Sequence, residues 1–179
     1  MLKMISPRTR TLIEARQGGA AVELAMIAPL FLLILLITIE LCIMLYTQSV
    51  LDASARTAAR QIRTGQVQSS ATPQTAFQNT FCANVSIAIS CGSVAMDIES
   101  FANFSSMSLP AVQTDKKGNV TNANFAPGGP GSAVAVRVFY TYHFVVPWVS
   151  FMLNPNGNGV ILQSTVVFQN EPFPTGVGG

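Results

Sequence analysis

An uncharged run near the N-terminus places the strongest constraint on this chain of 179 residues. The sixteen residues that precede Glu40 carry no charge, and the apolar sequence then continues to Tyr46. Counted from Ala20, a helix over this segment would be roughly 40 Å long, and a bilayer core needs about 20 such residues. The segment is apolar on every side, which favours lipid over the core of a soluble protein. We therefore expect one transmembrane helix at about 24–46.

The distribution of charge predicts how this helix is oriented. Residues 1–18 carry a net charge of +3, residues 19–63 of zero and residues 64–179 of −1. A basic segment before the span places the N-terminus in the cytoplasm, so the body of the chain lies outside it. A cleaved signal peptide fits less well. The apolar region of a signal peptide is shorter than this one, and a cleavage site of small residues follows it directly.

The helix is expected to continue beyond the membrane, from about Ala20 to Arg63, because neither Pro nor Gly occurs after the span before Gly65. Within its outer half we place an apolar face at Val50, Ala53, Thr57 and Ala58 and a basic face at Arg56, Arg60 and Arg63. Glu40 is expected at the outer headgroups of the membrane, and Cys42 as an unpaired, buried thiol.

The composition offers little material for catalysis. Only 10% of the residues are charged, compared with about 25% in an average protein. His143, the single histidine, lies in a β-rich run, where a structural role is far commoner than a catalytic one. Asp97 and Glu99 point to the same side of a predicted strand, and we interpret them as a solvated polar face rather than a weak cation site. We expect no enzyme, no cofactor, no metal site and no nucleic-acid partner.

The body of the chain is predicted to be α+β. Its expected elements are a short helix at 74–82, a strand at 93–99, a mostly irregular segment at 101–131, and two β-rich runs at 133–146 and 160–169. The long N-terminal helix and the small antiparallel sheet form an α+β layout, in which the outer half of the helix covers one sheet face. Cys82 and Cys91 are expected to form a disulfide, because the body lies in an oxidising compartment.

A motif precedes the apolar run. A basic leader ends at Gly18, four small or apolar residues follow, and then comes Glu23. The arrangement resembles the processing site of type IV prepilins, which implies cleavage between Gly18 and Gly19 by a prepilin peptidase. The new α-amine of Gly19 would neutralise Glu23 of a neighbouring subunit, since an unpaired buried carboxylate is costly. A simpler interpretation is that Glu23 stabilises the helix N-terminus.

The body adds a second resemblance. A Cys-containing segment precedes an alternating strand, a β-rich run ends at Pro147-Trp148, and the closing residues 167–173 read Val-Phe-Gln-Asn-Glu-Pro-Phe. With the N-terminal motif, these features resemble the TadE-like family, which are minor pseudopilins of the tight-adherence (Tad) pilus system. The resemblance implies a role in assembly or initiation of an adhesive pilus at the bacterial inner membrane. It also implies three partners: prepilin peptidase, other Tad pilins and pseudopilins, and the inner-membrane assembly platform.

The chain is thus expected to divide into a cleaved leader at 1–18, a long helix at 19–63 and an extracytoplasmic α+β domain at 64–179. The alternative is an uncleaved bitopic anchor that carries an extracytoplasmic binding domain. The N-terminal residue of the mature protein distinguishes the two, because the first requires Gly19 and the second Met1.

Overall fold

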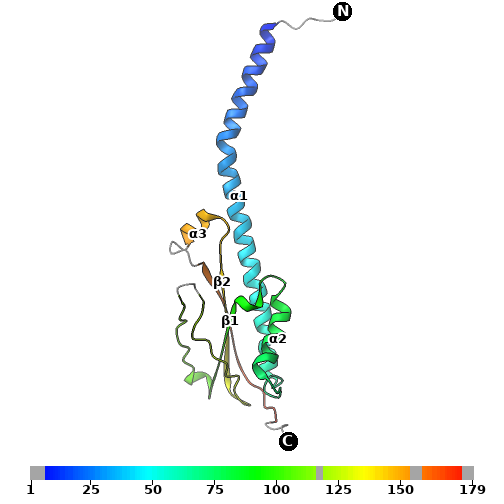
Figure 1. Cartoon of the computed structure of the whole chain (residues 1–179), viewed down its shortest axis with the longest axis vertical. Coiled ribbons are helices and arrows are strands. Elements are labelled where there is room, and N and C mark those ends of the chain that lie inside the picture. The colour runs from blue at the N-terminus through cyan, green and yellow to red at the C-terminus, as the bar shows by residue number, and fades with distance from the viewer. Residues whose placement is uncertain (1–6, 116–118, 154–158, 175–179) are drawn as a thin grey trace, which may run out of the picture. The chain divides into compact units, whose positions relative to one another are not determined.

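A computed structural model describes residues 7–115, 119–153 and 159–174, and their side chains from residue 19 onward except at 152 and 153. The elements, in chain order (Figure 1), are α1 (Pro7–Arg63), α2 (Pro73–Val85), β1 (Val94–Phe101), β2 (Ala133–Tyr142), α3 (Pro147–Leu153) and β3 (Val160–Gln169), with short 3₁₀ turns at Cys91–Ser93 and Phe104–Ser106. The chain divides into two compact units, Met1–Leu41 and Cys42–Gly179.

The long N-terminal helix is confirmed. Its segment Gly19–Arg63 is long and apolar enough to cross a membrane, and the helix continues through Pro29. In the first unit its large apolar side chains face outward; Met26 is 78% exposed and Phe31 61%. Such a surface is stable only in an apolar environment, because exposed apolar area costs about 25 cal/mol per Å² in water.

The second unit is built on a three-stranded antiparallel sheet in the order β1-β2-β3. The register aligns Ile98 with Val136 and Val136 with Val166, so these side chains share one face of the sheet. The α+β expectation is therefore confirmed, and β3 has the bounds expected for the last strand.

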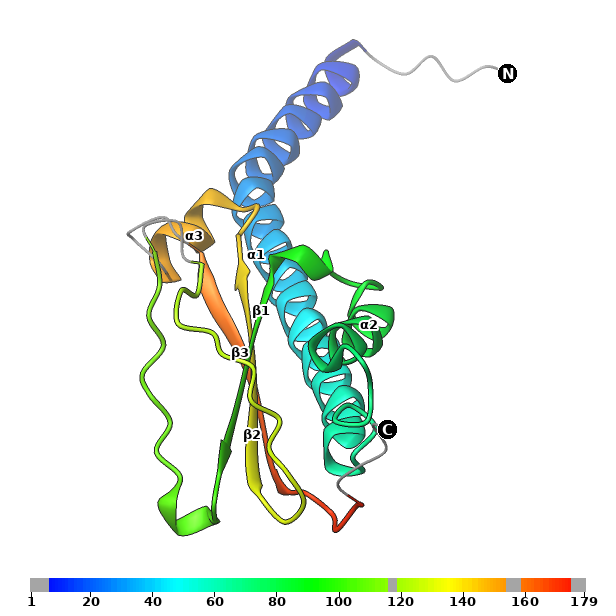
Figure 2. The ribbon, with the colours of Figure 1, turned by 60° about the horizontal axis from the view of Figure 1, so that its bottom comes forward.

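The core lies between this face of the sheet and two helices, the outer half of α1 and α2, which lie on the same side (Figure 2). Its fully buried members are Leu51, Ala55, Ala58 and Ile62 of α1, Val67 after it, Phe77, Phe81 and Val85 of α2, and Ile98, Val134, Val136 and Val138 of the sheet. Small alanines on α1 let the helix approach the sheet closely, and the two stacked phenylalanines of α2 fill the remaining volume.

Three local expectations were wrong. The apolar face of α1 is centred on Leu51 and Ala55, whereas Ala53 and Thr57 are exposed, because the sheet meets the helix on the side that carries its largest apolar residues. Cys42 is unpaired as expected, but it is exposed. The third concerns the β-rich run at 133–146: it ends as a strand at Tyr142, and α3 follows, with proline at its first position.

Candidate functional site

The expected processing site lies within α1. The backbone is helical across Gly18 and Gly19, and a Cβ built on Gly19 would meet nothing within 4 Å. Each glycine makes the helix about 1 kcal/mol less stable than alanine would. Two adjacent glycines therefore make α1 locally less stable at this point.

Glu23 follows one helical turn after Gly19, at the start of the exposed apolar surface. Its side chain is exposed, and the structure shows no hydrogen bond or ion pair between it and another described side chain. Between Arg16 and Glu40 it is the only charged residue of the sequence. Before this carboxylate can enter an apolar environment, it needs a cation that the described side chains around it do not supply. Glu40, in contrast, is buried at 4% exposure, and its expected position at the outer headgroups stays a prediction.

At the C-terminal end of α1, hydrogen bonds and packing contacts attach the C-terminal segment of the chain to the helix. The backbone N–H of Glu171 donates to the carbonyl of Arg63 at 2.9 Å, and the two side chains form an ion pair at 3.2 Å. Phe173 covers Gly65, whose φ of 79° belongs to the left-handed region, and a Cβ there would lie 2.5 Å from the Phe173 ring. Glycine is needed at 65 for both reasons.

Asn170 completes this attachment. It is buried, and its side-chain amide donates to the carbonyls of Pro127 and Gly129 at 3.0 and 2.9 Å. We call Asn170, Glu171 and Phe173 the C-terminal clasp. All three belong to the closing residues that carry the second resemblance. That part of the sequence therefore has a structural role, because it holds the end of β3 and the loop before β2 against the end of α1.

The outer face of the sheet contains a buried ion pair that sequence reasoning missed. Asp97 and Arg137 are neighbours in the β1–β2 register, and they are 2% and 5% exposed. The guanidinium donates from Nε and Nη2 to Oδ2 of Asp97, with the Nε bond at 2.9 Å. Glu99 is 3.6 Å from the same guanidinium. The solvated polar face expected at Asp97 and Glu99 is therefore wrong, because Arg137 neutralises them and the following loop covers them.

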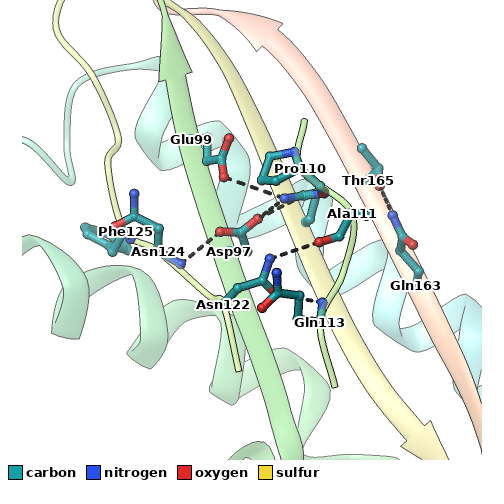
Figure 3. A network of polar contacts seen from close by, with 11 residues as sticks. Asp97, Glu99, Pro110, Ala111, Gln113, Asn122, Asn124, Phe125, Gln163 and Thr165 are labelled. Atoms are coloured by element: carbon teal, nitrogen blue, oxygen red, sulfur yellow. Dashed lines mark hydrogen bonds and ion pairs between the residues drawn. The ribbon is translucent and has the colours of Figure 1, made fainter. Parts of the chain in front are cut away.

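This pair holds that loop in place (Figure 3). The Nη1 of Arg137 donates to the carbonyl of Pro110 at 2.7 Å, and the backbone N–H of Asn124 donates to Oδ1 of Asp97 at 2.8 Å. Backbone bonds between Ile98 and residues 124 and 126 add a short parallel pairing along the free edge of β1. The signal in the sequence was Arg137 itself, a single charge in an otherwise uncharged strand.

The two cysteines of the body are joined in the structure. Cys82 on α2 and Cys91 before β1 form a disulfide with a Cα–Cα distance of 5.3 Å, within the range that this bond requires. It fixes the turn between α2 and the sheet. Among the described residues, no three His, Cys, Asp or Glu side chains come together to hold a metal ion, and His143 is exposed.

Comparison with known proteins identifies the N-terminal helix. Residues 18–60 match the family model described as TadE-like protein. The match starts at Gly18, contains Glu23, and ends three residues before α1 does. It confirms the TadE-like resemblance over these residues, while the clasp lies outside it. No curated protein and no solved structure matches the chain.

Proposed function

We propose that this TadE-like chain is a minor pseudopilin that acts in the assembly or initiation of a Tad-type adhesive pilus. The observation that carries the proposal is the coincidence of the family match with α1, from Gly18 through the exposed apolar surface. In this proposal a prepilin peptidase cleaves between Gly18 and Gly19. The mature helix then packs among the helices of other Tad pilins at the inner-membrane platform, with its N-terminus cytoplasmic and the second unit outside.

Cleavage changes the charge at the site where helices would dock. In the intact chain the nitrogen of Gly19 is a neutral amide, and the leader before it carries +3. Hydrolysis removes that charge and creates an α-amine with a pKa of about 8, which is protonated at neutral pH. Only the processed chain therefore offers a compact cation at the end of an apolar helix.

Glu23 supplies the matching anion. Its side chain is exposed and begins a surface that otherwise requires lipid or other helices around it. The α-amine of a neighbouring processed subunit neutralises this carboxylate when the two helices pack side by side. Because an unpaired charge costs several kcal/mol in an apolar environment, the pairing selects one axial stagger between the helices.

The second unit supports the same role by holding α1 rigidly. The buried side chains from Leu51 to Ile62 fasten the outer half of the helix to the sheet, and the clasp fastens its last turn to the C-terminal segment. In this proposal the sheet and the clasp fix the outer half of α1 within the second unit.

The mature N-terminus tests the proposal. Mass spectrometry of the protein purified from pilus-producing cells should show a chain that begins at Gly19. Gly18→Val should leave the leader attached, because a branched side chain cannot take the place of glycine in the extended substrate. Gly92→Val is the control, since a Cβ at Gly92 meets nothing within 4 Å, and it should be processed normally.

Two results would contradict the proposed processing. An intact Met1 in cells that make functional pili would refute processing and would support the uncleaved bitopic anchor. Normal cleavage of Gly18→Val would refute the assigned bond.

A further inference from the structure

A group of apolar side chains on and before α3 is exposed in the second unit. Val145 is 86% exposed, Phe151 71% and Trp148 65%, and Pro147, Trp148 and Phe151 line one hollow in the surface. The sequence contains no Lys, Arg, Asp or Glu between Arg137 and Glu171. We propose that α3 is an interfacial membrane anchor, whose aromatic side chains enter the outer surface of the bilayer that α1 crosses.

The exposure follows from how α3 is attached. Val149 is buried at 4% exposure and packs the helix against the rest of the unit. Trp148 and Phe151 are three residues apart, so they lie on one side of the helix. Backbone bonds from residues 149 and 150 to the carbonyl of Val146 close the first turn. With Val149 held inside, the two aromatic rings are presented outward together.

Two contacts determine the level of α3 along α1. The backbone N–H of Glu171 donates to the carbonyl of Arg63 at the C-terminal end of α1. Nearer to the N-terminus of α1, Nε2 of Gln48 donates to the carbonyl of Gln163 at 3.0 Å. The strand β3 therefore runs parallel to α1. Its first residue, Val160, lies about 10 Å beyond Gln163, which corresponds to about seven residues of helix.

This places the start of β3 near residue 42 of α1, and α3 at the same end of the sheet (Figure 2). Here α1 exposes Ile43, Leu45 and Tyr46, the last residues of its apolar run, while Gln48 and Ser49 begin the polar part. The outer membrane surface is therefore expected at the level of α3. Trp and Tyr are the residues that favour this interface, and an interfacial helix buries its apolar face about 5–10 Å into it.

Lipid explains these features together better than a protein partner does. The patch is small, uncharged and rich in aromatic residues, and α1 brings it to the bilayer without a further binding event. An anchor of this kind would limit how far the second unit can tilt away from the membrane. The inference rests on the proposed membrane span of α1, and it is independent of whether the leader is cleaved.

Trp148 makes the test direct, because it is the single tryptophan of the chain. The full chain is reconstituted into phosphatidylcholine vesicles whose acyl chains carry bromine at a shallow or a deep position. We expect shallow bromine to reduce the Trp148 emission about twofold, and deep bromine to reduce it less. Acrylamide in the aqueous phase should quench it less in vesicles than in the chain unfolded in urea.

The matched control moves the tryptophan to the other end of the sheet. Trp148→Phe combined with Phe104→Trp places it after β1, beside the Phe101–Ala133 pair and about 20 Å farther along the strands. Neither bromine position should quench this variant. Carbonate-resistant flotation with the vesicles reports the insertion of α1 separately, so a failed span is distinguished from a failed anchor.

Two results would overturn the inference in protein that floats with the vesicles. The first is Trp148 emission that no bromolipid quenches. The second is Trp148 that acrylamide reaches freely until another protein is added, because that would assign α3 to a protein partner.

Discussion

Arg137→Met tests what the buried ion pair contributes to stability. The substitution keeps most of the side-chain volume but removes the guanidinium, so the carboxylate of Asp97, at 2% exposure, loses its cation and two donors. It keeps the bond from the N–H of Asn124. Removing one partner of a buried pair costs about 3–5 kcal/mol. The carbonyl of Pro110 also loses its donor, so we expect the upper part of that range.

The assay is urea unfolding of the full chain in detergent micelles, followed by far-ultraviolet circular dichroism and by proteolysis of the loop at 107–125. Extrapolation to zero denaturant gives the free energy of unfolding of the second unit. Arg63→Met is the matched control. Its ion pair with Glu171 is half exposed, and surface pairs contribute about 0–1 kcal/mol. Cleavage within the loop should accelerate in Arg137→Met and stay unchanged in the control.

The double variant Arg137→Met with Asp97→Leu separates the charge from the packing. With both charges removed, the remaining loss is that of two backbone partners, about 1 kcal/mol each, so the double variant should be more stable than Arg137→Met alone. The role assigned to this pair is refuted if Arg137→Met lowers the free energy of unfolding by less than about 1 kcal/mol. It is also refuted if the loss in the double variant equals the sum of the losses in Arg137→Met and Asp97→Leu alone.

Three further predictions concern the membrane helix, the disulfide and the clasp. Glu23→Ala should insert into the membrane normally but fail to support pilus assembly, and Glu23→Asp should restore part of it; immunoblots of sheared surface fibres decide, and normal piliation by Glu23→Ala would refute the docking role. Cys82→Ser with Cys91→Ser should lower the free energy of unfolding by about 2.5 kcal/mol; an unchanged urea midpoint would contradict this. Gly65→Ala should cost about 1–3 kcal/mol through its positive φ and the contact with Phe173; Phe173→Ala in the same background should relieve the steric part, and no relief in urea unfolding would argue against the contact.

Features that depend on local composition and periodicity were predictable from the residues alone. Sixteen uncharged residues can only be buried in lipid or a large apolar core, so the helix at 24–46 was predictable. The strand at 160–169 was predictable from its β-rich composition, and the motif from Gly18 to Glu23 from residue type and spacing alone. The family match confirms the resemblance over 18–60, whereas the roles of Gly18, Gly19 and Glu23 remain predictions.

Which side chains share an environment depends on how distant segments of the chain pack together. Asp97 and Arg137 are 40 residues apart, and nothing local shows that the β1–β2 register makes them neighbours or that a loop then excludes water from them. The same holds for Phe173 over Gly65, and for α3, whose distance from the membrane surface depends on how β3 runs along α1. Periodicity indicates which side of an element is apolar. Which other element covers that side depends on long-range packing and therefore on the free energy of the whole fold.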